Sequence, residues 1–202
     1  MVNVNRVVKN EIKKFEDNKD KTKIIKKSNE LIIEFGFEIA KYHRQRSSRY
    51  SVYDPLGNYK KLIINNIIEN MEKSNIKITE EEFISPIELD LLFINTPNFS
   101  NYSNKNILYK LIGLVKRTIT PDLDNLAKTP MDILNNIAWK DDASIHKMSI
   151  EKRYGLEQKT LIKIKYGKLN NPSGRITEDE KEKYEKEIEW INKNKKKKEE
   201  KV

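Results

Sequence analysis

The chain has 202 residues, of which 37% are hydrophobic and 35% are charged, and its formal net charge is +9. This length allows one domain with extensions or two very small domains, and the basic balance favours a polyanionic partner such as nucleic acid. Cysteine is absent, which excludes disulfides, thiolate zinc sites and cysteine nucleophiles. Neither a secretory signal nor an apolar stretch long enough to span a bilayer is found, so we expect a cytoplasmic protein with no membrane partner.

The N-terminal part of the chain predicts one short amphipathic helix and one buried strand. In residues 1–16 the apolar side chains recur at the spacing of one helix face, at Val4, Val8, Ile12 and Phe15. Residues 16–23 are charged and lack apolar anchors, which is typical of a linker. Residues 31–39 (LIIEFGFEI) alternate as in a buried strand.

The middle of the chain predicts a basic segment, a helix and a second strand. Residues 41–53 mix basic and aromatic side chains, and residues 53–58 (YDPLGN) have turn chemistry. A helix is predicted over residues 59–72, with one face formed by Ile64, Ile67, Ile68 and Met71. Residues 87–94 alternate as a strand with at least one buried face.

The remaining part predicts two helices, two strands and a charged tail. Apolar spacing predicts helices over residues 104–116 and 125–136, and alternation predicts a pair of strands over 144–152 and 160–166. Thr177 and Glu180 form a capping-box pattern that opens a lysine-ended helix. This order predicts one α/β or α+β domain over residues 23–170, with a helical extension at 1–22 and a charged helical tail at 171–202.

The segment that carries chemistry is residues 121–142 (PDLDNLAKTPMDILNNIAWKDD). Asp122 and Asp124 are two residues apart, so in an extended segment both side chains project to the same side; Asp124 could instead be the N-cap of the helix that follows. Lys128 follows Asp124 by about one helical turn. Asp141 and Asp142 come just before a predicted strand, and if the helix packs back against the sheet, Asp142 could reach the Asp122/Asp124 pair.

Three carboxylates around a phosphodiester suit Mg²⁺, which binds hard oxygen ligands. Such an ion would activate a bound water and offset charge on the leaving oxygen. Lys128 is placed to stabilise the transition-state charge, and the loss of one such group typically costs about 3 kcal/mol. The ordinary structural interpretation has Asp124 as a cap, Lys128 paired with Asp124 or Asp132 on the helix surface, and a turn at Asp141 and Asp142.

The same segment resembles the signature of the RusA-type Holliday junction resolvases: Asp-Leu-Asp-Asn-Leu-x-Lys, then Asp-x-Leu, then Trp-x-Asp-Asp before a strand. Weaker similarity extends over residues 31–166. Pro130 lies inside the predicted helix and removes one backbone hydrogen bond, so a kink or a late helix start is expected. Members of this family are frequently carried by phages and prophages.

The resemblance implies a small mixed α/β fold and a homodimer that cuts four-way DNA junctions by paired nicks in recombination and repair. It implies dependence on Mg²⁺, for which Mn²⁺ can substitute, and no small-molecule cofactor. The family's essential carboxylates correspond to Asp122, Asp124 and Asp142, and its essential lysine corresponds to Lys128. Asp141 is a further candidate metal ligand.

A basic and aromatic segment is the candidate DNA contact. Its arginines would bind phosphates and a tyrosine could stack on an unpaired base; its members are Tyr42, Arg44, Arg46, Arg49, Tyr50 and Tyr53. We expect Lys140 to join these contacts. The alternative is a solvated loop with tyrosines packed on the domain. His43 and His146 lack a convincing metal partner, and Trp139 is interpreted as a packing residue.

Two other functions fit the sequence. One is a catalytically inactive protein of the same fold that binds branched DNA, although all four expected polar residues are present. The other is a replication-associated adaptor in which the aspartates form a structural cation site.

Overall fold

A computed structural model describes residues 4–42, 46–47 and 52–168, together with residues 182, 185 and 189. The chain forms two compact units, Met1–Lys168 and Leu169–Val202. In the second unit Glu182, Glu185 and Glu189 are helical and exposed, whereas the capping-box pattern at Thr177 and Glu180 lies outside the described residues. No helix in the described part of the chain is long and apolar enough to cross a membrane.

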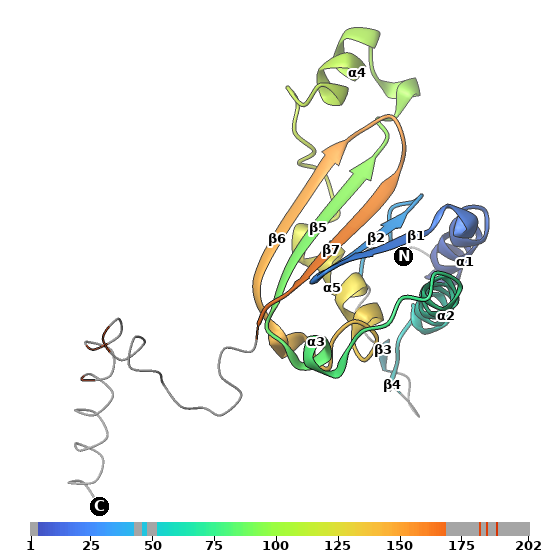
Figure 1. Cartoon of the computed structure of the whole chain (residues 1–202). Helices are drawn as coiled ribbons and strands as arrows, with labels where there is room; N and C mark the ends of the chain where they lie inside the picture. The colour runs from blue at the N-terminus through green and yellow to red at the C-terminus, as the bar shows by residue number, and fades with distance from the viewer. Residues whose placement is uncertain are drawn as a thin grey trace, which may run out of the picture. The chain divides into compact units, whose positions relative to one another are not determined.

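A five-stranded mixed sheet organises the first unit (Figure 1). Its strands lie in the order β1-β2-β7-β5-β6, with bounds β1 Lys23–Lys27, β2 Glu30–Phe35, β7 Lys159–Tyr166, β5 Ile87–Asn95 and β6 Ile145–Tyr154. Only the β5/β6 pair is parallel among these strands; the other neighbours are antiparallel. A separate two-stranded ladder joins β3 (Arg46–Ser47) to β4 (Val52–Tyr53). The predicted α+β class with a small mixed sheet is confirmed.

Three helices pack on one face of this sheet and share its core: α1 (Val4–Glu16), α2 (Gly57–Lys73) and α5 (Leu123–Leu134). Alternate strand residues such as Leu31, Ile33 and Phe35 are buried against them. The residues between these are half-buried or exposed, so within the described residues the other face of the sheet is the more exposed one. Two shorter helices, α3 (Glu80–Ile84) and α4 (Asn104–Leu111), lie near opposite ends of β5 (Figure 1).

The N-terminal helix is part of the core. Phe15 is 4% exposed, and its ring meets that of Phe37 edge-on with centroids 5.9 Å apart. Val8 and Ile12 also pack against the core. The helical face predicted from the sequence is therefore the face that the structure buries.

The structure corrects several element predictions. Residues 19–21 form a 3₁₀ turn (η1, Lys19–Lys21) and β1 begins at Lys23, where we expected a linker. In α2 the buried residues are Tyr59, Ile63, Ile67 and Met71, whereas Ile68 is 40% exposed. The helix predicted over residues 104–116 ends at Leu111, and Gly113 follows with a φ of 80°, a conformation that suits glycine.

The last two strands along the chain, β6 and β7, do not pair with each other, because β5 lies between them. The connection from β6 to β7 passes over the end of β5, where the Gly155 N–H donates to the Asn95 carbonyl over 3.0 Å. A Cβ at Gly155 would lie 2.4 Å from Cγ2 of Ile94, so this crossing requires glycine. As a result, β6 is an edge strand of the sheet.

Candidate functional site

The first half of the aspartate segment lies at the beginning of α5. This helix begins at Leu123, two residues earlier than predicted, and Asp122 rather than Asp124 is its N-cap. Asp122 has an extended backbone, and its side chain makes no capping hydrogen bond. Asp124 lies in the first turn, and both side chains are exposed. Pro130 lies inside the continuous helix, so the expected late start is not observed.

The loop before α5 is tied to β6. The Lys152 ammonium group donates to the carbonyls of Ile119 and Pro121, each over 2.7 Å. Pro121 directly precedes Asp122, so these two bonds hold the approach to the helix. In the first turn of α5, the Asn125 carbonyl accepts a hydrogen bond from the Tyr42 N–H over 2.7 Å.

A buried ion pair anchors the same loop further back. Arg117 is 3% exposed and Glu38 is 7% exposed. Both guanidinium Nη atoms bond the carboxylate: Nη1 to Oε2, and Nη2 to Oε1 over 2.8 Å. Two-point pairing of this kind fixes the orientation of both groups. The pair links the segment just after β2, which contains Glu38, to the segment that leads to Asp122.

Two titratable groups of α1 adjoin this ion pair. Lys14 donates through Nζ to the Glu38 carbonyl over 2.9 Å. Burial lowers the pKa of Lys14 and raises the pKa of Glu11, because each loses solvation of its charged form. Glu11, Lys14 and Glu38 line a small cavity of about 220 Å³ together with Pro121. The helix α1, which is not part of the aspartate segment, therefore supports the loop that leads to Asp122.

Lys128 lies over an aromatic ring. Its Nζ is 5.1 Å from the centroid of the Tyr42 ring, and Nζ of Lys60 is 5.6 Å from the same centroid. Lys60 in turn bonds Asp54 over 2.6 Å and Asp132 over 2.7 Å. Burial lowers the pKa of Lys60, but the hydrogen bonds to these two carboxylates outweigh it, so the pKa is raised.

The ordinary pairing considered for Lys128 is therefore not observed. Asp132 pairs with Lys60, and Lys128 forms no ion pair within the described part of the chain. Its ammonium group keeps an uncompensated charge one turn after Asp124.

The second half of the segment lies at the beginning of β6. Trp139 is fully buried, and its indole N–H donates to the Asn135 side chain over 2.6 Å, which confirms it as a packing residue. Asp141 caps the 3₁₀ turn η3 (Asp142–Ser144) by accepting from the Ala143 N–H over 2.8 Å. Asp142 and Lys140 are exposed.

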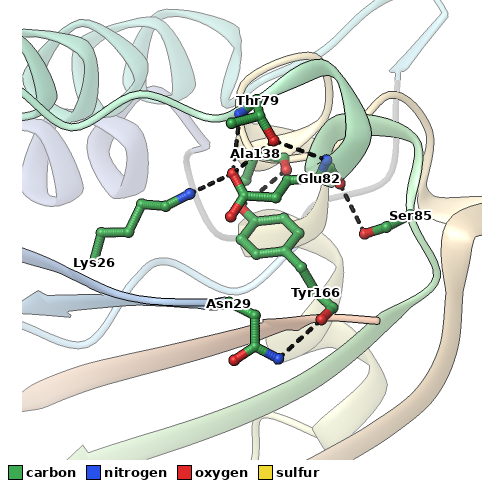
Figure 2. A network of polar contacts seen from close by, with 7 residues as sticks. All are labelled: Lys26, Asn29, Thr79, Glu82, Ser85, Ala138 and Tyr166. Atoms are coloured by element: carbon green, nitrogen blue, oxygen red, sulfur yellow. Dashed lines mark hydrogen bonds and ion pairs between the residues drawn. The ribbon is translucent and has the colours of Figure 1, made fainter. Parts of the chain in front are cut away.

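A polar network holds the chain just before Asp141 (Figure 2). The Tyr166 hydroxyl donates to the Ala138 carbonyl over 3.1 Å, and the Lys140 N–H donates to the Phe83 carbonyl over 2.9 Å. Glu82 bonds Lys26 and closes a capping box with Thr79. Burial raises the pKa of Tyr166, so its hydroxyl stays a donor. The turn with Asp141 and Asp142 is thus positioned by α3, β1 and β7.

The two halves of the segment lie at different ends of β6 in one chain. Lys152, which holds the approach to Asp122, follows Ile145 by seven residues, and a strand of that length spans about 23 Å. Asp142 precedes Ile145. Within the described residues, no three Asp, Glu, His or Cys side chains are grouped so that they could hold a metal ion. The expectation that Asp142 converges with Asp122 and Asp124 is not met inside one chain.

Most of the basic and aromatic segment lies outside the described residues, including His43, Arg44, Arg49 and Tyr50. The backbone of Arg46 pairs with that of Tyr53 across the β3/β4 ladder. Tyr42 is half-buried next to α5, and His146 is exposed on β6. DNA contact by Arg44, Arg46, Arg49, Tyr50 and Lys140 stays a prediction.

Sequence reasoning missed the residues that support the site. Glu38 and Arg117 are 79 residues apart, and Lys60 and Asp132 are 72 residues apart. No local spacing signals such a pair. Alternation over residues 31–39 gave no clue to Glu38 either, because it assigns Glu38 to the same face as Glu34, opposite the apolar side chains.

Comparison with known proteins identifies the class and then the family. The sequence profile described as Endodeoxyribonuclease RusA matches residues 36–165, which include both halves of the aspartate segment. The match assigns the chain to a class of endodeoxyribonucleases. The chain belongs to the RusA family. The helix α1 and the strands β1 and β2 all precede the matched range.

A weaker similarity connects the chain to a bacterial protein. "Uncharacterized protein YqaN" of Bacillus subtilis (strain 168) is 28% identical over 81 residues, which are 40% of this chain and 57% of that protein. The similarity thus spans little more than half of the length of that relative.

Proposed function

We propose that the chain is a metal-dependent endonuclease that resolves four-way DNA junctions by paired nicks, as a homodimer. Membership of the RusA family carries this proposal, because the matched range contains the complete segment from Asp122 to Asp142. The exposed carboxylates of Asp122, Asp124 and Asp142 support it, since none of them is in an ion pair within the described residues.

The donor chemistry of Asp122 and Asp124 suits Mg²⁺ or Mn²⁺. Mg²⁺ usually binds one or two carboxylates together with substrate phosphates and water. This pair lies at the positive end of the α5 dipole, and no cation of the described residues pairs with either carboxylate. Within the described residues of one chain, Asp142 is not grouped with this pair as a third ligand. When bound, the ion would activate a water molecule and offset charge on the leaving oxygen.

The residues of the chain have separate roles in this proposal. Asp122 and Asp124 hold the ion, Asp142 of a second copy completes its ligand set, and Asp141 is a further candidate ligand. Lys128 stabilises the charge that develops on the phosphate, for which its uncompensated ammonium group over Tyr42 is suited. Lys152 and the Glu38–Arg117 pair keep the approach to Asp122 in place.

A second copy of the chain would close the gap to Asp142. Within the described strands β6 pairs only with β5, so its outer edge is unpaired, and residues 146–149 of this strand are exposed. Antiparallel pairing of two β6 edges about a two-fold axis would place the beginning of one strand beside the end of the other. Asp142 of the partner subunit would then approach Asp122 and Asp124. Resolution of a junction by two symmetric cuts also requires two such sites.

Cleavage of a labelled synthetic four-way junction tests the proposal. We expect paired nicks with Mg²⁺ or Mn²⁺, no product with EDTA, and loss of cleavage but not of binding in Asp124→Asn. Undiminished nicking by Asp124→Asn would refute the site. Asp20→Asn, in the exposed η1 turn, is the matched control and should cleave like the wild type.

The absence of a three-carboxylate group within the described residues favours one alternative, a catalytically inactive protein that binds branched DNA. This function predicts junction binding with no product in either Mg²⁺ or Mn²⁺.

A further inference from the structure

A groove of about 810 Å³ lies beside the candidate site. One wall is the end of α4 and the segment after it (within residues 110–117). The other wall is formed by the end of β6, the turn to β7 and the beginning of β7 (within residues 151–159), and Ile94 of β5 also lines the groove. We call this the basic groove. Figure 1 shows α4 next to the end of β6 where this groove is located.

The lining of the basic groove is strongly cationic. It contains six basic side chains, at Lys110, Lys116, Arg117, Lys152, Arg153 and Lys159, and two acidic ones, at Glu151 and Glu157. Arg117 is neutralised by Glu38 and Lys159 by Glu34. Lys116 and Arg153 are exposed and in no ion pair within the described part of the chain. Two cations are therefore free to bind an anion from solution.

A third cation is held in place without a carboxylate. Lys110 is only 7% exposed, and its Nζ is 3.0 Å from the centroid of the Tyr102 ring and 5.0 Å from that of Tyr154. Ring faces attract the ammonium group but do not neutralise its charge. Lys110 therefore adds positive potential to the wall of the groove.

The basic groove continues to the proposed nuclease site. Lys152 lines the groove, and its Nζ bonds the carbonyls of Ile119 and Pro121 immediately before Asp122. A strand with one phosphate at Asp122 and Asp124 would have its neighbouring phosphates within reach of this groove, since phosphates follow each other closely along a strand.

We propose that the basic groove binds the sugar-phosphate backbone of the DNA arm that flanks the cut, with Lys116 and Arg153 as the phosphate contacts. The assignment rests on the proposed function for the identity of the nucleic acid, but binding can be measured without cleavage. Contacts of this kind carry no sequence information. The groove should therefore bind junction and duplex arms alike.

The competing occupant is a second copy of the chain. Ile112 is 59% exposed and Leu156 is 78% exposed, and both line the groove. Apolar side chains at this position could pack on a protein as well as on sugar rings. The net positive lining favours DNA, because a second copy of this chain is itself basic.

The test compares two double variants by fluorescence anisotropy in EDTA, with a labelled four-way junction and a labelled linear duplex. Lys116→Ala/Arg153→Ala removes the proposed contacts. Lys23→Ala/Lys27→Ala removes the same charge from exposed positions on β1, at the opposite edge of the sheet. We expect about tenfold weaker binding of both DNAs by the groove variant, and a slope of log K against log salt that is shallower by about 2. The β1 variant should bind like the wild type.

Equal binding by the groove variant and the β1 variant would overturn the proposal. A drop in molar mass by light scattering in the groove variant, with DNA binding per chain unchanged, would assign the groove to a contact between copies and also overturn it. If the wild type binds DNA through these residues but cuts no junction, the groove stands and the nuclease proposal fails.

Discussion

Replacing Glu38 with glutamine removes one charge of the buried ion pair and leaves the buried guanidinium group of Arg117 without its carboxylate. The Glu38 and Arg117 residues are 7% and 3% exposed, so solvent screens the remaining charge weakly. The pair also has bidentate geometry. Loss of one partner of such a buried pair costs about 3–5 kcal/mol.

That cost is a large part of the stability of a domain of this size, which is typically about 5–15 kcal/mol. With a urea m-value of about 2 kcal/mol per molar, the midpoint of unfolding should fall by about 2 M. The double variant Glu38→Met/Arg117→Met removes both charges and should regain most of the loss, because a neutral buried pair leaves no unpaired ion.

Urea unfolding followed by circular dichroism measures these effects, with Glu69→Gln as the matched control. Glu69 and Lys73 form an exposed i,i+4 pair at 3.9 Å, and such a pair contributes about 0.3–0.5 kcal/mol. A loss below about 1 kcal/mol for Glu38→Gln would refute the reasoning that burial makes an unpaired charge costly at this pair. A double variant as unstable as the single variant would refute the assignment of the loss to an unpaired charge.

Three further results are expected. Glu11→Gln should raise the melting temperature at pH 7, because the raised pKa of Glu11 means that its ionised form is disfavoured in the folded state. This gain should vanish below pH 4.5, where Glu11 is protonated in both the folded and the unfolded chain. A lower melting temperature of the variant at pH 7 would contradict the prediction. Tyr42→Ala should slow junction cleavage by a few fold by removing the ring under Lys128, whereas Tyr42→Phe should retain the rate; equal rates for both variants would show that the ring does not position Lys128. Trp139→Ala should cost about 3–5 kcal/mol in urea unfolding, because the fully buried ring leaves a cavity, and a loss under about 1 kcal/mol would show that the site collapses around it.

The elements with a clear apolar period were predictable from the sequence. The helix of residues 1–16 shows its inward face through Val8, Ile12 and Phe15, and the strand at 87–94 shows its alternation. β1 was not predictable, because KIIKK has only two apolar residues and is too short to show a period. Ile68 was assigned to the wrong face because the crowded isoleucines of α2 allow more than one stripe.

The position of the site residues along the chain was predictable, but their position in space was not. The order of Asp122, Asp124, Lys128 and Asp142 identified the family that the profile match confirms. Asp142 lies just before β6, so its position in space depends on the place of β6 in the sheet. No pattern in the sequence indicates that β5 lies between β6 and β7. The same holds for the contacts of Lys152 and Arg117, which join segments far apart in the chain.

The most direct test of a site shared between two copies is a mixing experiment with two inactive variants. Asp124→Asn and Asp142→Asn are prepared separately, exchanged into mixed dimers, and assayed for nicking of a four-way junction in Mg²⁺. A shared site predicts that mixing restores nicking, because one of the two sites in a mixed dimer then has every wild-type ligand. Continued inactivity of the mixture, with exchange verified by mass and each variant inactive alone, would contradict a site built from two chains.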